Sequence, residues 1–226
     1  MKYISIAIDG PSGAGKSTLA RRAAADLGYL YVDTGAIYRT VALSAVRQGI
    51  APSDAAKLIP TLEHLDIRLE YDPRDGLQHM YLNGEDVTTQ IRLHEISQHA
   101  STVSAIPEVR AFLLELQRDL ARKNNVIMDG RDIGTVVLPA ADVKIFLTAS
   151  AQARATRRHL ELQQRGQQAD FNTVLRDIIA RDEQDTNRPI APLRQAEDAV
   201  LLDTTELDLD QSLDTLLSVI KKELAK

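Results

Sequence analysis

The segment from Gly10 to Ser17 reads Gly-Pro-Ser-Gly-Ala-Gly-Lys-Ser and follows an apolar run at 3–8. The run predicts a strand, and the amphipathic stretch that starts at Lys16 predicts a helix. A glycine-rich turn between a strand and a helix directs backbone N–H groups and the positive end of the helix dipole at an anion. The spacing therefore predicts a phosphate-binding loop, in which Lys16 supplies a positive charge and Ser17 a hydroxyl for Mg²⁺. A chance glycine-rich turn would not account for the agreement of strand, spacing and helix.

Composition limits the class of protein. The chain has 226 residues, 44% of them hydrophobic and 26% charged, which suits a soluble globular enzyme with one sizeable core. A net charge of −5 argues against bulk nucleic-acid binding, which needs a basic surface. There are no cysteines, so disulfides, thiolate metal sites and a cysteine nucleophile are excluded. No apolar run has the length of a secretory or membrane segment, so we expect a cytoplasmic protein without a membrane partner.

Apolar runs alternate with amphipathic stretches along the chain. This alternation predicts a parallel sheet with helices on both faces. We expect strands at 3–8, 29–32, 125–129, 143–148 and 199–202, and helices at 16–27, 36–48, 107–123, 151–164, 171–186 and 209–224. Polar residues follow or end four of these strands, and ligands of open parallel sheets bind beyond the carboxyl ends of the strands.

Residues 66–90 have a different pattern. Two segments of alternating polarity, 66–71 and 78–82, are separated by the turn sequence 72–76 and followed by Asn83-Gly84. This pattern predicts a small antiparallel meander. Because it has no crossover helices, we expect it to belong to a subdomain inserted into the parallel core.

Two segments at strand ends carry further candidate site residues. In the first, Thr34 and the early helical N–H groups can receive an anion or cap the helix, and Arg39 can reach back to the same pocket. The alternative is an N-capped helix with an arginine in solvent. In the second, an apolar strand ends at Asp129, and Gly130 turns the chain toward Arg131 and Asp132.

The second segment suggests three roles. Asp129 could orient Mg²⁺-bound water, while Asp132 could accept a hydrogen bond from a sugar hydroxyl or a base amine. Arg131 would lie over the same crevice. The alternative is a strand-end turn closed by an Asp–Arg pair.

Two helices carry arginines at helical spacing. Arg154, Arg157 and Arg158 fall on one face and begin the segment 151–170, whose polar end is typical of a lid that closes over a triphosphate. A solvated charged face is the alternative. Arg181 and Arg188 flank Asp185 on one face of the next helix and could grip a monophosphate, or form an ordinary surface salt bridge.

Together these motifs resemble the nucleoside monophosphate kinases, and within them the bacterial cytidylate kinases. The resemblance runs nearly end to end, through the segments 10–17, 33–39, 129–137, 144–147 and 181–188. It implies an α/β P-loop NTPase fold with a five-stranded parallel sheet, an inserted antiparallel β subdomain and a short lid. It also implies one kinase domain with a core at about 1–35, 100–150 and 171–226, a nucleoside monophosphate-binding insertion at about 36–99 and a lid at about 151–170.

The resemblance implies roles for individual residues. ATP would be bound by Gly10, Pro11, Ser12, Gly13, Ala14, Gly15, Lys16, Ser17, Thr18, Arg154, Arg157 and Arg158. CMP or dCMP would be surrounded by Thr34, Arg39, Ser101, Arg110, Arg131, Asp132, Arg181, Asp185 and Arg188. Of these, Ser101 and Arg110 have the alternative of a helix-capping serine and a surface arginine, with one helix ending before Pro107 and another beginning there.

The reaction that follows is transfer of the γ-phosphoryl group of ATP to CMP or dCMP. The catalytic residues would be Lys16, Arg131, Arg157, Arg158 and Arg188, with Mg²⁺ held by Ser17 and, through water, by Asp33 and Asp129. Two alternatives stay open: a kinase for another small acceptor, and a nucleotide-regulated binding module without catalysis. We expect a monomer with no nucleic-acid partner.

Overall fold

The structure, a computed structural model, describes residues 2–72, 77–164 and 166–226. The chain divides into two units. The first consists of Met1–Tyr31 and Ala121–Lys226, and the second of Val32–Leu120.

A five-stranded parallel sheet forms the centre of the first unit, as the sequence predicts. Strand β1 pairs in parallel with β6 and with β7, and β7 pairs with β8. The strand order is β2-β6-β1-β7-β8, and the strands are β1 (Ser5–Asp9), β2 (Leu30–Asp33), β6 (Val126–Gly130), β7 (Val143–Thr148) and β8 (Val200–Asp203). Strand β1 begins later than predicted because the N–H of Ile4 donates to the side chain of Asn125, at 2.8 Å, and the ladder starts at Ser5.

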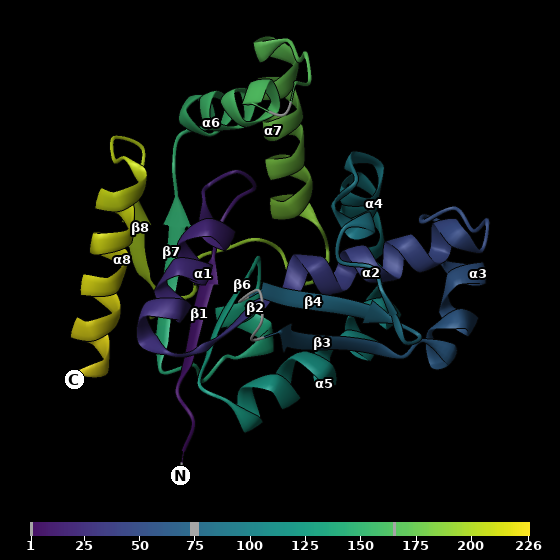
Figure 1. Ribbon diagram of the computed structural model, residues 1–226, viewed down its shortest axis with the longest axis horizontal. Helices are drawn as coiled ribbons and strands as arrows, with labels where there is room; N and C mark the ends of the chain where they lie inside the picture. The colour runs from purple at the N-terminus through teal and green to yellow at the C-terminus, as the bar shows by residue number, and fades with distance from the viewer. Residues whose placement is uncertain (1, 73–76, 165) are drawn as a thin grey trace. The chain divides into compact units, whose positions relative to one another are not determined.

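Two helices cover one face of this sheet. Helices α1 (Lys16–Leu27) and α8 (Leu209–Leu224) lie beside the strands in Figure 1. Apolar side chains of α1 and α8 form one buried core with alternate residues of the strands, including Ile6, Ile8 and Ile145. Helix α8 starts at Asp208, whose side chain forms a capping box with Gln211.

The opposite face carries a short π-helix that the sequence pattern does not predict. This segment, η3 (Ile133–Val137), follows β6. Because successive strand residues point to opposite faces, Asp9 points away from the core that contains Ile8. The carboxylate of Asp9 accepts hydrogen bonds from the N–H groups of Ile133 and Gly134, which fixes η3 on this face.

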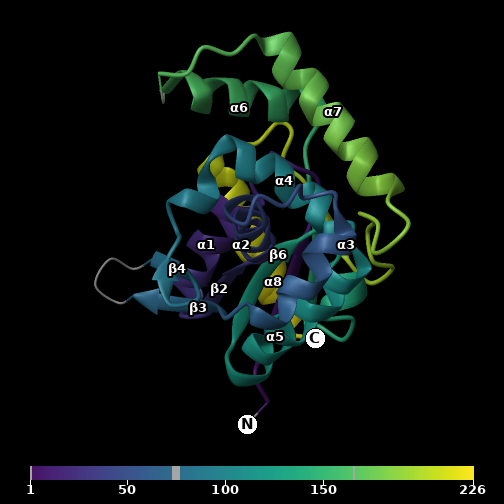
Figure 2. The same ribbon diagram turned by 90° about the vertical axis from the view of Figure 1, so that its right-hand side faces the viewer.

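A helix pair completes the first unit. Helices α6 (Ala151–Gln164) and α7 (Phe171–Asn187) lie close to each other in Figure 2. Ala155 of α6 and Val174 and Ile178 of α7 form a buried apolar cluster between them. Asp170 caps α7 by accepting a hydrogen bond from the N–H of Thr173 at 2.8 Å. Both helices lie within two residues of their predicted bounds.

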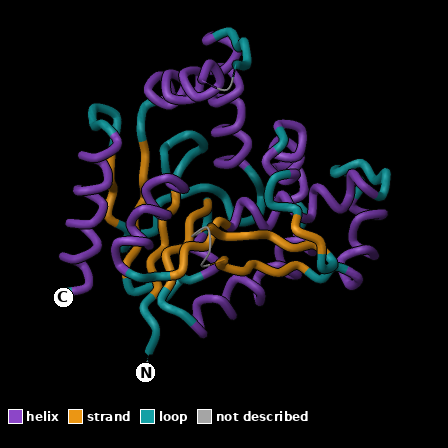
Figure 3. Tube along the Cα trace, in the orientation of Figure 1, coloured by secondary structure: helices purple, strands orange, loops and turns teal. Residues whose placement is uncertain are grey.

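The second unit contains the predicted antiparallel meander. Its sheet has the order β3-β4-β5, with β3 (Ile67–Asp72), β4 (Leu77–Leu82) and β5 (Glu85–Asp86), and Figure 3 shows strands in orange. Asn83 and Gly84 both have positive φ, 51° and 85°, as a two-residue hairpin turn requires. Most of the predicted turn at 72–76 lies outside the described residues.

Helical segments surround this small sheet in sequence. They are α2 (Thr34–Arg47), α3 (Ala55–Leu58), η1 (Ile59–His64), η2 (Gln90–Arg92), α4 (His94–Ser104) and α5 (Pro107–Lys123). Helix α4 ends before Pro107 and α5 begins there, as predicted. Within the described residues, no helix has the length and apolar character to cross a membrane.

We predict that only glycine fits at position 10, where β1 continues into the glycine-rich loop. Gly10 has a φ of 151°, and a Cβ there would lie 1.9 Å from the carbonyl oxygen of Leu147. Gly10→Ala should lower the free energy of unfolding by about 3 kcal/mol or more. Gly28→Ala is the matched control, because Gly28 has a φ of 67° but nothing within 4 Å, and it should cost about 1–2 kcal/mol. Equal losses in urea-induced unfolding would contradict the steric argument.

Candidate active site

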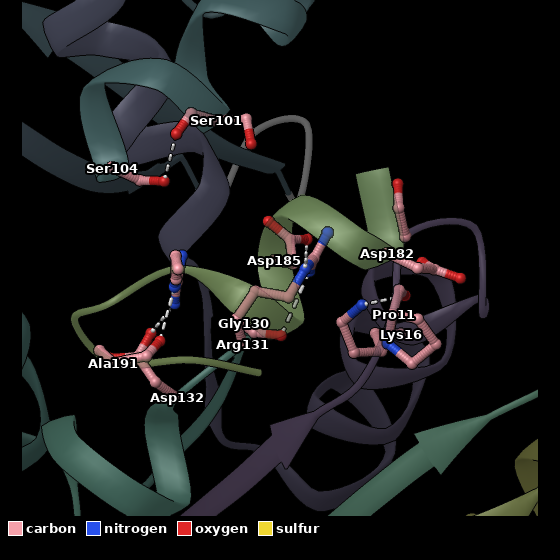
Figure 4. A network of polar contacts seen from close by, with 12 residues as sticks. Pro11, Lys16, Ser101, Ser104, Gly130, Arg131, Asp132, Asp182, Asp185 and Ala191 are labelled. Carbon is pink, nitrogen blue, oxygen red and sulfur yellow. Dashed lines mark hydrogen bonds and ion pairs between the residues drawn. The ribbon is translucent and has the colours of Figure 1, made fainter. Parts of the chain in front are cut away.

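The glycine-rich loop, Gly10–Ser17, joins β1 to α1 as the sequence predicts. Gly13 and Gly15 have positive φ, and Lys16 begins the helix. Ala14 and Lys16 are buried, whereas Ser17 and Thr18 are exposed on the first turn of α1. The Nζ of Lys16 donates to the carbonyl oxygen of Pro11 at 2.8 Å, so its ammonium lies inside the curve of the loop (Figure 4).

The electrostatic surroundings of Lys16 disfavour its charge. Burial and the positive charge of Arg131 lower the pKa of Lys16 to about 7, although the carboxylates of Asp129, Asp185 and Asp9 act in the opposite direction. A bound anion would restore the balance, because it would add negative charge beside the ammonium.

A hydroxyl–carboxylate–hydroxyl chain lies beside the loop. The Oγ of Ser17 donates to one oxygen of Asp129 at 2.8 Å, and the hydroxyl of Tyr31 donates to the other at 3.0 Å. Asp129 is buried at the end of β6. Ser17 and Asp129 were both predicted, and the structure brings them together. The sequence analysis did not predict Tyr31 as a site residue. The signal that could have identified it is its place in the predicted strand 29–32.

Two ion pairs connect the turn after β6 with the end of α7. Arg131 Nε donates to Asp185 at 2.7 Å, and Arg188 Nη2 donates to Asp132 at 3.2 Å. Arg131, Asp132 and Asp185 lie close together in Figure 4, with the backbone of Ala191 beside Asp132. The Nε of Arg188 also donates to the carbonyl oxygen of Ala191 at 2.6 Å. The predicted residues Arg131, Asp132, Asp185 and Arg188 therefore form one polar cluster.

The charge on Asp185 is stabilised within this cluster. Burial acts to raise its pKa, but the charge and hydrogen bond of Arg131, with the charges of Arg181 and Arg188, outweigh burial and lower the pKa of Asp185. Asp185 is buried, so the surface salt bridge considered for this helix face is wrong. The group is a desolvated site with more than one cation around a carboxylate.

The three arginines of α6 do not share a single target. Arg154 is buried and donates to Asp182 at 2.6 Å, and its guanidinium also reaches the carbonyl oxygens of Ser12 and Ala149. Arg157 donates to the carbonyl oxygens of Thr204 and Leu207, and Arg158 to Glu161 at 2.8 Å. Helical spacing predicted the common face but not these separate partners. Asp182 was missed, although it directly follows Arg181 in a segment that the sequence had singled out.

In the second unit, Asp33 caps α2. Its carboxylate accepts from the N–H of Ala36 at 2.9 Å and from Arg39 at 2.8 Å. Thr34 is buried as the first residue of α2, so the cap is Asp33 and not Thr34. A role for Asp33 as a water-mediated metal ligand stays a prediction.

Arg110, also in the second unit, is buried rather than a surface arginine. Its guanidinium carbon lies 5.6 Å from the centre of the Tyr38 ring, and Nη1 donates to the carbonyl oxygen of Ser104 at 3.2 Å. The Oγ of Ser104 donates to the carbonyl oxygen of Ser101 at 2.9 Å (Figure 4). Ser101 lies inside α4, so it is not a helix cap. Tyr38 and Ser104 were missed by the sequence reasoning.

Comparison with known proteins gives a consistent result. The family model described as cytidylate kinase matches residues 6–222. A cytidylate kinase from Caldicellulosiruptor bescii is 50% identical over 222 residues, covering 98% of this chain and 97% of that protein. One from an Exiguobacterium species is 48% identical over 223 residues, covering 97% and 99%. The solved structure of an uncharacterized protein from Eubacterium ventriosum aligns over 99% of each chain with a TM-score of 0.50 at 12% identity, which is a likeness of fold alone.

We predict that the Arg154–Asp182 pair is energetically coupled. A double-mutant cycle with Arg154→Met and Asp182→Asn should give a coupling of about 1–3 kcal/mol in the free energy of unfolding, because the Arg154 side chain is only 5% exposed. The exposed pair Arg158–Glu161 is the control, with side chains 36% and 42% exposed, and should give less than about 0.5 kcal/mol. Coupling of similar size in both cycles would contradict the prediction.

Proposed function

Because the chain belongs to the cytidylate kinase family, we propose which of its residues bind the two nucleotides and assist the transfer between them. The protein is a phosphotransferase that moves the γ-phosphoryl group of ATP to CMP or dCMP, giving CDP or dCDP. The structural observation that best supports the proposed roles is the buried Lys16 in the glycine-rich loop, in the same unit as the Arg131–Asp185 and Arg188–Asp132 pairs.

The donor would bind at the glycine-rich loop. Backbone N–H groups between Gly10 and Thr18 and the ammonium of Lys16 would hold the outer phosphates of ATP. In the structure Lys16 donates to the carbonyl oxygen of Pro11, so the phosphate oxygens would compete with that acceptor. Arg154 reaches the loop through the carbonyl oxygen of Ser12, while Arg157 and Arg158 would approach the transferring group from the lid segment 151–170.

The hard oxygen donors of Ser17 and Asp129 suit Mg²⁺. Their side-chain oxygens are 2.8 Å apart, and Mg²⁺ is usually bound by one or two protein oxygens, substrate phosphates and water. When bound with ATP, the ion would neutralise charge on the β- and γ-phosphates. Ser17 would ligate Mg²⁺ directly, and Asp129 would orient a water molecule bound to the ion. Asp33 would be a further ligand through water.

The acceptor would be recognised by arginines, acidic side chains and hydroxyl groups. These are Thr34, Arg39, Ser101, Arg110, Arg131, Asp132, Arg181, Asp185 and Arg188. Arginine forks match phosphate oxygens in pairs, and carboxylates accept from the amine of cytosine or from ribose hydroxyls. Residues 36–99 would form the monophosphate-binding insertion and residues 151–170 the lid, while 1–35, 100–150 and 171–226 would form the kinase core.

The transfer needs charge neutralisation more than a protein nucleophile. A phosphate oxygen of CMP attacks the γ-phosphorus of ATP, the new P–O bond forms as the bond to the β-phosphate oxygen breaks, and ADP leaves. Two anions must approach each other, so Lys16, Arg131, Arg157, Arg158 and Arg188 would lower their repulsion. We further propose that the protein works as a monomer in the cytoplasm without a nucleic-acid or membrane partner, in keeping with its net charge of −5.

We predict the acceptor specificity of the enzyme. ADP formation from Mg-ATP should depend on CMP or dCMP. It should be much weaker with UMP, which lacks the exocyclic amine that the acceptor carboxylates suit, and with AMP or GMP, whose purine bases are larger than cytosine. A reaction without acceptor is the control for simple ATP hydrolysis. Activity with a different acceptor alone would discard the acceptor-site assignment, and no activity with any of them would favour a nucleotide-binding module.

We predict that the protein takes up protons when ATP binds near pH 7.5. Because the pKa of Lys16 is lowered to about 7, much of the ligand-free protein has a neutral amine at this pH, and phosphate anions would raise the pKa again. ATP affinity should therefore fall as pH rises above 7. Calorimetric titrations in buffers of different ionisation enthalpy measure the uptake. Lys16→Arg is the control, since its guanidinium stays charged, and an unchanged uptake would contradict the role of Lys16.

A further inference from the structure

Asp9 makes two hydrogen bonds to adjacent backbone N–H groups that are far away in sequence. The last residue of β1, it is 5% exposed. One carboxylate oxygen accepts from the N–H of Ile133 at 2.8 Å, and the other accepts from the N–H of Gly134 at 2.7 Å. The end of β1 is thereby fixed to the start of η3.

The two segments joined by Asp9 continue directly into proposed substrate-binding residues. On one side, β1 runs straight into Gly10 and the glycine-rich loop. On the other, Ile133 follows Arg131 and Asp132, which pair with Asp185 and Arg188. A single carboxylate therefore bonds the strand that carries the donor loop to the turn that carries acceptor-binding groups.

The two N–H groups need two acceptor oxygens. Gly134 sets no steric limit on the contact with Asp9, because a Cβ there would lie 3.4 Å from the Asp9 carboxylate, an ordinary contact distance, and 3.2 Å from Cδ of the flexible Lys144 side chain. Only a carboxylate offers two acceptor oxygens to the two N–H groups. The amide of an asparagine would offer one oxygen and turn a donor toward the other N–H, leaving that group unpaired.

Asp9 is ionised at the pH of a normal kinase assay. Burial raises its pKa to about 6, Asp132 acts in the same direction, and the N–H groups of Gly134 and Ile133 and the charge of Lys16 oppose the rise. At pH 7.5 the carboxylate can therefore accept both hydrogen bonds.

We propose that Asp9 is a positioning residue for phosphoryl transfer, which holds the Arg131–Asp132 turn in register with the glycine-rich loop. This inference rests on the proposed function. Asp9 makes no contact with either nucleotide in this account. Its effect would be on the alignment of donor and acceptor, and small misplacements of bound reactants reduce turnover strongly.

The test compares Asp9→Asn with Asp142→Asn in the full chain. Asp142 is a matched control, because its carboxylate also accepts from a backbone N–H of β1, that of Ser5 at 2.9 Å, but at the end of the strand away from the loop. Turnover with Mg-ATP and CMP, the dissociation constant of each nucleotide measured alone, and the thermal unfolding midpoint are determined at pH 7.5.

We expect Asp9→Asn to lower kcat by about 10- to 100-fold while each dissociation constant stays within about 3-fold of wild type. Asp142→Asn should keep kcat within about 2-fold. If Asp9→Asn does not fold, Asp9→Glu keeps the charge, but its longer side chain displaces the carboxylate from the two N–H groups. This variant should likewise lower kcat while the dissociation constants stay within about 3-fold of wild type.

Two outcomes would overturn this inference and leave the proposed function intact. One is an Asp9 variant with the kcat of the Asp142 variant, and the other is a parallel loss of kcat and of nucleotide binding, which is the mark of a merely structural residue. A wild-type protein without CMP-dependent ADP formation would instead overturn the proposed function, and the inference with it.

Discussion

Buried positive charge at the carboxyl end of the parallel sheet depends on internal acceptors. A cation removed from water costs several kcal/mol unless it is paired, and the fold supplies partners for four cationic side chains of the proposed site. Lys16 has the carbonyl oxygen of Pro11, Arg131 has Asp185, Arg188 has Asp132, and Arg154 has Asp182. Without these acceptors, so many buried cations in one unit would not be compatible with a folded, ligand-free protein.

The same pairing shapes recognition. In the proposed function, a nucleotide phosphate would have to exchange with the carbonyl or carboxylate oxygens that already hold these cations. This exchange lowers the net gain from each contact and favours ligands that satisfy several cations at once. Two pKa shifts reflect this competition between burial and charge. Burial and the charge of Arg131 lower the pKa of Lys16. The surrounding cations outweigh burial and lower the pKa of Asp185.

Local sequence patterns predicted the parts of the structure that depend on local rules. The glycine-rich loop, the five strands, the meander at 66–90 and the helix starting at Pro107 all follow from periodicity and turn chemistry. The π-helix η3 was missed because its first N–H groups are satisfied by Asp9, more than a hundred residues away. Asp182 and Tyr31 were missed for the same reason: their partners, Arg154 and Asp129, are neighbours only in the fold. Arginine spacing on α6 indicated a shared face, but no spacing rule specifies which carbonyl each guanidinium reaches.

The different partners of the α6 arginines have a mechanical consequence. Arg154 ties the first turn of the helix to the glycine-rich loop and to α7, and Arg157 ties the next turn to the segment after β8. The described bond of Arg158 stays within α6, because its partner, Glu161, lies one turn further along the same helix. The N-terminal half of α6 is therefore held by side-chain bonds to the loop, to α7 and to the segment after β8. If the lid segment closes over a nucleotide, Arg157 must exchange the carbonyl oxygens of Thr204 and Leu207 for phosphate oxygens, so closure would release the helix from the segment after β8.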